Sequence, residues 1–230
     1  MAEMGNKRPV DVAEDALIKG ILDGTYPMWT KLPGERRLVE LIGVTRPTLR
    51  EALRRLEQDG WLTVQHGKAT VVNNYWQDGG MNIITTLTRF PDHMPHDFVS
   101  NLLQVRTDLA PSYMSLAVQN NQKMVLDYLA QAADPPATAE ALARYDWGLH
   151  HMMTIASGNP IYTLVMNGFA GFYEQMAVLY FSLPETEGGS RPFYTKLYQL
   201  AQTQAIEEIR VYVAEEMAQS AERWKQVKLL

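Results

Sequence analysis

Residues 31–74, KLPGERRLVELIGVTRPTLREALRRLEQDGWLTVQHGKATVVNN, decide the fold of the first part of the chain. A short helix begins near Leu32 to Glu35, because proline is tolerated at a first helical position and an acidic residue suits the positive end of a helix dipole. Gly43 ends this helix, and Thr45 is a good N-cap for a second helix that runs from Arg46 to Asp59. Two helices joined by so tight a turn predict a helix-turn-helix.

The spacing of side chains gives the second helix an apolar face and a basic face. In the first helix one buried stripe is expected at Leu38, Leu41 and Ile42. In the second helix leucines recur at Leu49, Leu53 and Leu56, and arginines recur on another face at Arg46, Arg50 and Arg54. Arginine forks suit guanine O6 and N7, and threonine hydroxyls suit phosphates. An arginine-rich face that is merely solvated is the alternative.

A predicted β-hairpin follows the second helix and makes DNA binding the better interpretation. Trp61 to Val64 alternates like a strand, His66-Gly67-Lys68 is a turn, and Ala69 to Val72 is a returning strand. A hairpin with a basic tip is typical of a wing. The sequence therefore predicts an N-terminal winged helix-turn-helix with a small β-hairpin.

The stretch resembles the DNA-binding domain of the GntR family of bacterial transcription regulators, in its segments LPGER, GVTRPTLREAL and DGW. Within that family, the wing QHGK and the following NNYW are similar to the FadR group of fatty-acid-metabolism regulators. The resemblance implies DNA contacts at Arg36, Thr45, Arg46, Thr48, Arg50, His66, Gly67 and Lys68. The resemblance departs at Pro47, where members of that group commonly have threonine, so one hydroxyl contact is lost.

The charge of the chain is unevenly distributed. The formal net charge is −5 and the isoelectric point is about 5.6, which by itself argues against nucleic acid. Between Lys31 and Lys68, however, there are 8 basic and 5 acidic residues. Weak, salt-dependent DNA binding by each monomer is expected, with a homodimer supplying the rest. Cysteine is absent, and neither a signal core nor an apolar run of membrane length is present, so a cytoplasmic protein without a membrane partner is expected.

The second half of the chain shows helical patterns with almost no strand signal. Helices are expected at about 80–90, 95–119, 121–133, 138–156, 160–182, 191–203 and 204–227. The fold class is therefore mainly α: residues 1–74 form the winged helix-turn-helix, 75–79 a short joint, and 80–230 an all-α helical bundle for effector binding and dimerisation.

Two helical stripes and one arginine are candidates for a ligand site. The stripes are Phe169, Tyr173, Met176 and Tyr180, and Val213, Met217, Ser220 and Trp224. Such stripes usually form core, but the hydroxyls among them need partners when buried. Arg106 follows apolar residues in its helix, and a buried charge is costly unless it is paired. Either a salt bridge satisfies Arg106, or Arg106 and the hydroxyls meet an anionic ligand with a long apolar tail.

Three segments of this half, LLQVRT at 102–107, ASGNPIY at 156–162 and FYTKL at 193–197, resemble the effector domain of the FadR group. The resemblance implies a homodimer that binds long-chain acyl-CoA and then releases DNA, repressing fatty-acid degradation and activating unsaturated fatty-acid synthesis. It places ligand contacts at Arg106, Tyr180, Tyr194, Ser220 and Trp224. Met217 stands where glycine is usual near the CoA, which bears on the shape of the pocket.

A metal-bound small carboxylate is the competing effector. Asp146 and His150 share a helix face at i, i+4, and related GntR effector domains use such a pair with further histidines on a metal. The last two helices contain no histidine, and the corresponding positions are held by Tyr194 and by a residue near Glu216. No metal and no other cofactor is therefore expected.

An enzyme is the third possibility. His150, Asp146 and Ser157 could form a hydrolase constellation, but Ser157 lies in a plain SGNP loop without an oxyanion signature. There is also no phosphate-binding loop or dinucleotide motif. The chain is expected not to be an enzyme.

Overall fold

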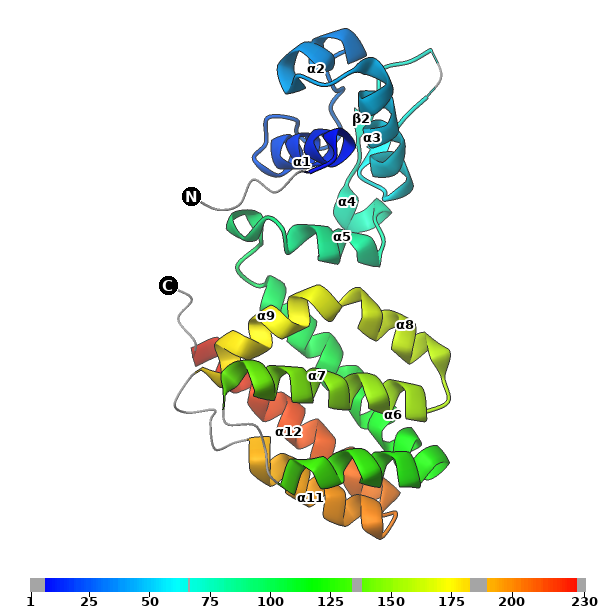
Figure 1. The fold of residues 1–230 in the computed structure, drawn as a ribbon, viewed down its shortest axis with the longest axis vertical. Helices are drawn as coiled ribbons and strands as arrows, with labels where there is room; N and C mark the ends of the chain where they lie inside the picture. The colour runs from blue at the N-terminus through cyan, green and yellow to red at the C-terminus, as the bar shows by residue number, and fades with distance from the viewer. Residues whose placement is uncertain (1–6, 66, 134–137, 183–189, 227–230) are drawn as a thin grey trace. The chain divides into compact units, whose positions relative to one another are not determined.

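A computed structural model describes residues 7–65, 67–133, 138–182 and 190–226. The chain forms two compact units, Met1–Met94 and Pro95–Leu230 (Figure 1). The described residues form helices and one short antiparallel hairpin, which confirms the predicted mainly α fold class. The first unit contains residues that the sequence assigned to the joint and to the start of the effector domain.

The first unit is a winged helix-turn-helix. Its elements are α1 Pro9–Leu22, α2 Glu35–Ile42, α3 Arg46–Gln58, β1 Leu62–Thr63, β2 Val71–Val72, α4 Tyr75–Asp78, α5 Met81–Leu87 and the 3-10 helix η1 Pro91–His93. Gly43, with φ of 75°, ends α2 in the left-handed region that favours glycine. The Thr45 side chain accepts a hydrogen bond from the Thr48 backbone N–H, so Thr45 caps α3 as predicted.

The apolar face of α3 forms the core of this unit. Leu49, Leu53 and Leu56 are buried, as expected, and they pack with α1, α2 and β1. Leu38 is also buried, but Leu41 is 53% exposed, so the predicted stripe of α2 is wrong at that position. A helix of eight residues has room for only one narrow buried face, and Leu41 lies outside it. The strands are shorter than predicted, with Leu62 opposite Val72 and Thr63 opposite Val71.

The second unit is a helical bundle, built from α6 Phe98–Leu129, the 3-10 helix η2 Ala130–Ala133, α7 Ala139–Ala156, α8 Pro160–Gly168, α9 Ala170–Phe181, α11 Ser190–Gln202 and α12 Ile206–Gln226. Asn121, with φ of −149° and ψ of 52°, interrupts α6 where two helices were predicted to meet. The single helix expected over 160–182 is instead α8 and α9, which meet at Phe169.

The core of the bundle lies where α6, α7, α11 and α12 pack together (Figure 1). Met114, Leu149, Leu197 and Val213, one from each of these helices, are fully buried in it. Helix α9 packs against α7 and covers another side of it. Among the described residues, no helix combines the length and the apolar character needed to cross a bilayer.

Candidate functional site

The first candidate site is the exposed N-terminal part of α3. Its first turn carries two hydroxyls, because the Thr45 and Thr48 side-chain oxygens lie 2.9 Å apart. Pro47 occupies a position at which a missing N–H costs no helical hydrogen bond. The first turn therefore carries two threonine hydroxyls, and hydroxyls suit a phosphate.

Three of the predicted DNA-binding arginines, Arg36 in α2 and Arg46 and Arg50 in α3, are exposed. The side chain of Arg46, the first residue of α3, makes no hydrogen bond or ion pair with another described residue. Arg50 donates from Nε to Glu35, and Arg36 donates from Nε to Glu40. Arg54 is also exposed, but both Nε and Nη2 of its guanidinium donate to Glu51. The structure thus leaves Arg36 of α2 and Arg46 and Arg50 of α3 exposed to solvent.

The tip of the hairpin carries the remaining predicted DNA contacts. Gly67 has φ of 74° and open space around it, and Lys68 is exposed beside it. The Lys68 backbone N–H donates to the Gln65 carbonyl at 3.0 Å and closes the turn. His66 lies outside the described residues. A glycine and an exposed cation at a hairpin tip can approach a nucleic-acid backbone closely.

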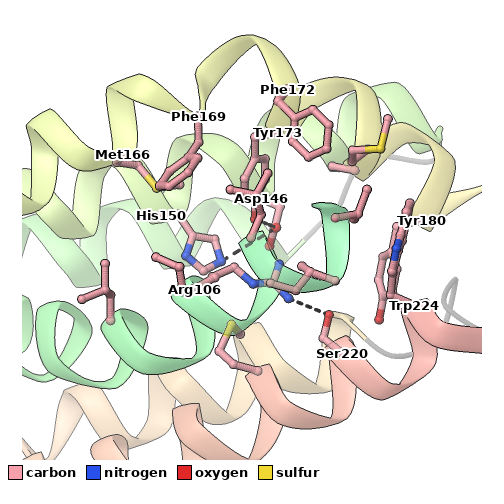
Figure 2. Close-up of a pocket in the computed structure, with 18 of the residues that line it drawn as sticks. Arg106, Asp146, His150, Met166, Phe169, Phe172, Tyr173, Tyr180, Ser220 and Trp224 are labelled. Carbon is pink, nitrogen blue, oxygen red and sulfur yellow. Dashed lines mark hydrogen bonds and ion pairs between the residues drawn. The ribbon is translucent and has the colours of Figure 1, made fainter. Parts of the chain in front are cut away.

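The second candidate site is a pocket of about 120 Å³ inside the helical bundle (Figure 2). Its walls come from α6, α7, α8, α9, α11 and α12, and most of the lining is apolar. The apolar lining includes Leu102, Leu103, Met166, Phe169, Phe172, Met176, Met217 and Trp224. Such a lining is suited to a hydrocarbon chain, because burying apolar surface stabilises a complex by about 25 cal/mol per Å².

Polar groups lie together in the middle of this apolar lining. Arg106 Nη2 donates to Ser220 Oγ at 2.8 Å, which joins α6 to α12. The Asp146 carboxylate accepts from the Tyr173 hydroxyl at 2.5 Å and from the Tyr194 hydroxyl at 2.7 Å. Burial works against the charged form of Arg106, but Tyr173 and Asp146 outweigh it, and the pKa of Arg106 lies above its usual value. Arg106 is therefore a cation in the pocket wall, with a carboxylate nearby.

His150 is fully buried beside Asp146 and is neutral at physiological pH. Its Nδ1 lies 2.5 Å from the Tyr113 hydroxyl, and its Nε2 lies 3.9 Å from Asp146 Oδ2 without a hydrogen-bond partner. Burial raises the pKa of Tyr113 well above its usual range, so Tyr113 keeps its proton and donates it to Nδ1. The neutral ring then carries its own proton on Nε2, facing the carboxylate. Burial also lowers the pKa of His150 to about 4.

The low pKa of His150 predicts loss of stability in mild acid. The unfolded chain binds a proton at His150 near pH 6.5, whereas the folded chain binds it only near pH 4, so the free energy of unfolding falls as pH falls through that window. Between pH 7 and pH 5 the loss from His150 is about 2 kcal/mol. Urea denaturation at both pH values measures it. The His150→Gln variant should show a smaller pH difference, and an equal difference would contradict this assignment.

The structure brings four of the five predicted ligand residues to the pocket. Arg106, Tyr180, Ser220 and Trp224 line it. Tyr194 is 1% exposed and supports the pocket from behind, through its hydrogen bond to Asp146. Sequence reasoning missed Tyr113 as a polar partner in the pocket. Its signal was a hydroxyl on the buried face of α6, next to Met114, where a buried donor requires an acceptor.

The residues considered for a metal site and for a hydrolase site have other partners in the structure. Both Asp146 oxygens accept phenol hydroxyls, and Ser157 donates to the Thr154 carbonyl and lies at the end of α7. In the described part of the chain, no cluster of three or more His, Cys, Asp or Glu side chains could hold a metal. Asp146 and His150 therefore act here as partners of tyrosines.

Family models match nearly all of the chain. The model for bacterial regulatory proteins of the GntR family matches residues 9–72, and the model for the FadR C-terminal domain matches residues 73–230. Solved structures with a similar fold include E. coli McbR/YncC, with a TM-score of 0.50 and 18% identity over 96% of this chain and 98% of that chain. Lar, which controls the expression of the Listeria monocytogenes agr system, has a TM-score of 0.62 and 15% identity over 96% and 99%.

Full-length relatives agree with the family models. The fatty acid metabolism regulator protein of Yersinia enterocolitica is 42% identical over 87% of this chain and 84% of its own length. The protein of the same name from Shewanella amazonensis is 40% identical over 96% and 92%. Proteins of this family are transcription regulators and not enzymes. The chain belongs to the GntR family of DNA-binding transcription regulators and, within it, to the family of the fatty acid metabolism regulator proteins.

Proposed function

We propose that this regulator acts as a homodimer on a palindromic operator and that long-chain acyl-CoA, bound in the pocket of the helical unit, releases it from DNA. The observation that carries the proposal is the apolar pocket with the Arg106–Ser220 pair in its wall. In the cell such a protein represses fatty-acid degradation and activates unsaturated fatty-acid synthesis while acyl-CoA is scarce.

On DNA, two copies of α3 enter successive major grooves about one helical turn apart, and the wings reach the minor groove. Arg46 and Arg50 contact bases, whereas Arg36 and Thr48 hold the register on phosphates. The exposure of the three arginines and the paired hydroxyls of Thr45 and Thr48 support these roles. The DNA contacts of the wing are made by His66, Gly67 and Lys68.

Replacing Arg46 with alanine should weaken operator binding by about 1–3 kcal/mol and relax specificity, because a bidentate arginine contact to guanine is lost. Fluorescence anisotropy with an operator duplex and a random duplex of equal length measures both effects. Arg54→Ala is the matched control, since the Arg54 guanidinium is already held by Glu51. An equal loss on random DNA would make Arg46 a phosphate contact.

The effector acts through a difference in affinity between two conformations. Acyl-CoA binds better to the conformation whose paired α3 helices no longer match the half-site spacing. Binding of acyl-CoA then lowers DNA affinity, and DNA lowers acyl-CoA affinity by the same factor. The uncharged acyl chain of the ligand suits the apolar wall formed by Phe169, Phe172 and Met176. Arg106 and Ser220 offer hydrogen-bond donors to oxygen atoms of the ligand.

Replacing Trp224 with alanine should weaken the response to acyl-CoA at least about 10-fold, because a large buried aromatic contact is worth about 2 kcal/mol or more. Operator binding without ligand should be retained. Trp224 is only 5% exposed, so Leu197→Ala in α11, which removes buried core outside the pocket lining, controls for stability. If the Trp224→Ala and Leu197→Ala variants lose operator binding to the same extent, Trp224 contributes only to core packing and not to ligand binding.

The decisive experiment is fluorescence anisotropy of a labelled palindromic FadR-type operator, titrated with protein at fixed salt. One arm contains oleoyl-CoA and another contains acetate with Zn²⁺. Release by oleoyl-CoA alone is the expected result. If DNA binds but ignores oleoyl-CoA, the effector is a different metabolite. Sedimentation of the free protein, with a dimer mass expected, tests the homodimer separately.

A further inference from the structure

Arg50 and Arg36 each contact a carboxylate of α2 through only one nitrogen of the guanidinium. Arg50 Nε donates to both oxygens of Glu35, at 2.9 and 3.2 Å, and Arg36 Nε donates to Glu40 at 3.3 Å. The terminal amino groups, Nη1 and Nη2, of Arg50 and Arg36 make no hydrogen bond within the described part of the chain. Each guanidinium therefore keeps its two end donors for an outside acceptor.

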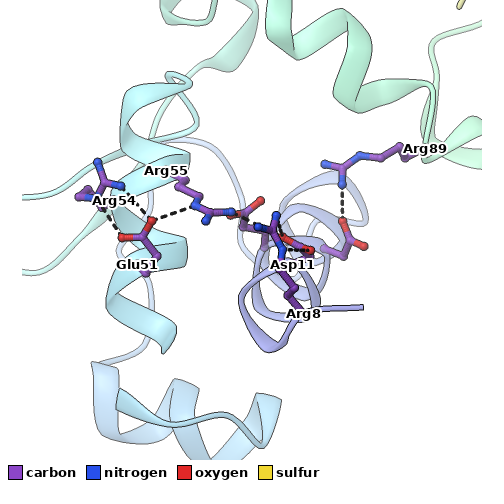
Figure 3. Close-up of polar contacts among 8 residues, drawn as sticks. Arg8, Asp11, Glu51, Arg54, Arg55 and Arg89 are labelled. Atoms are coloured by element: carbon purple, nitrogen blue, oxygen red, sulfur yellow. Dashed lines mark hydrogen bonds and ion pairs between the residues drawn. The ribbon is translucent and has the colours of Figure 1, made fainter. Parts of the chain in front are cut away.

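Neighbouring arginines of the same unit are used differently (Figure 3). Arg54 donates from Nε and Nη2 to Glu51, at 3.1 and 2.9 Å. Arg55 donates from Nε to Glu51 and from Nη1 to Glu14 of α1, each at 3.0 Å. These arginines tie α3 to itself and to α1, so their end donors are at least partly occupied. The pattern separates structural arginines from those that present a free fork.

A free fork is the part of arginine that reads guanine, because Nη1 and Nη2 match the spacing of O6 and N7. A long side chain that must be ordered on binding costs about 0.5–1.5 kcal/mol of entropy. A carboxylate that holds Nε from the side orders the guanidinium beforehand and leaves the fork outward. Glu35 is placed to do this for Arg50, since it lies at the first residue of α2 and reaches the second turn of α3.

We propose that Glu35 is a positioning residue for Arg50: its carboxylate holds Nε and aims the Arg50 fork at a base, which increases discrimination between operator and random DNA. The proposal rests on the base-reading role given above to Arg50. Glu35 itself touches no base.

If Glu35 acts only through its negative charge, replacing it should change operator affinity in the opposite direction. A carboxylate close to DNA repels phosphates, and it can also compete with them for Arg50. In that case removing Glu35 strengthens binding to every DNA sequence. If Glu35 positions Arg50, its removal weakens operator binding and leaves random DNA bound equally well or better. The ratio of the two affinities separates these roles, and a general loss of folding would lower both.

The experiment uses full-length Glu35→Ala, Glu35→Gln and Arg50→Ala proteins, and the Glu35→Ala/Arg50→Ala double variant. Anisotropy titrations with operator and random duplexes at several salt concentrations give both affinities. Glu51→Gln is the matched control, because it removes one negative charge from α3, and among the described residues the Glu51 carboxylate pairs only with Arg54 and Arg55. Circular dichroism verifies that each variant is folded.

Glu35→Ala should lower the operator-to-random affinity ratio about 2- to 10-fold. Glu35→Gln should retain most of the ratio, because its amide oxygen still accepts from Nε. In the Arg50→Ala background, Glu35→Ala should have no further effect on the ratio. An unchanged or increased ratio for Glu35→Ala, or an equal effect in the Arg50→Ala background, overturns the proposal. If Arg50→Ala alone leaves the ratio unchanged, the base-reading role of Arg50 fails instead.

Discussion

Replacing Asp146 with alanine is expected to lower the free energy of unfolding of the helical unit by about 3–5 kcal/mol, the cost of removing one partner from a buried charged network. The change leaves the Tyr173 and Tyr194 hydroxyls without their acceptor and removes the carboxylate near Arg106. Because the network joins α7 to α9 and α11, the loss should reach several helices. Hydrogen exchange of the full chain, followed in peptides from α6, α7 and α11, measures it.

The Asp146→Asn variant is the matched control. Its amide has nearly the same shape and can still accept from one of the two hydroxyls, so a smaller loss of about 1–3 kcal/mol is expected. If alanine and asparagine cost the same, the hydrogen bond and the shape that asparagine keeps contribute nothing, and the loss comes from the carboxylate charge and the second hydrogen bond. Exchange in α1 and α3 of the other unit should be unchanged in both variants.

Replacing Gly60 with alanine should destabilise the winged helix-turn-helix by about 2–5 kcal/mol. Gly60 follows α3 with φ of 87°, and a Cβ there would lie 2.6 Å from the Asp78 carbonyl oxygen and 2.7 Å from Gly79 Cα. Both neighbours are backbone atoms and cannot rotate away. The junction between α3 and β1 would have to move, and operator binding should weaken in parallel with the thermal stability of this unit.

The Gly24→Ala variant separates the two causes of that loss, which are the left-handed backbone conformation and the clash of the added Cβ with backbone atoms. Gly24 has φ of 79°, close to the value at Gly60, but nothing lies within 4 Å of the added carbon. Its cost should be about 1–2 kcal/mol, the price of the left-handed conformation alone. Thermal unfolding of both variants gives the comparison. Equal losses would mean that the contact with residues 78 and 79 relaxes without cost.

The helix-turn-helix could be predicted from the sequence because its signals are local. The Thr45 cap, the glycine after α2 and the leucine spacing of α3 each act within a few residues. Exposure of Leu41 could not be predicted in this way, since it depends on how wide a face α2 buries against α3. The break at Phe169 was likewise missed, because the helical stripe of apolar residues continues to Tyr180, although Asn167 and Gly168 just before the break are residues that often end helices.

The pocket was predictable in its residue types but not in its pairings. The helical stripe through Phe169, Tyr173, Met176 and Tyr180 lines it, as its spacing allows. That Tyr113 meets His150, 37 residues later, depends on how α6 packs against α7. The pairing of Asp146 with Tyr173 and Tyr194 has the same origin. A pattern within one helix indicates that a buried polar group needs a partner, but only the tertiary fold selects it.

The charged side chains of the described pocket lining add up to an electroneutral wall. Arg106 and Arg223 are matched in number by Asp146 and Glu216, and His150 is uncharged at physiological pH because its pKa is about 4. A hydrocarbon chain can enter a pocket with such a lining without bringing a counter-ion. A free carboxylate buried at the same depth would have to bring a proton or a cation with it. The wall thus favours ligands that keep their charges at the mouth.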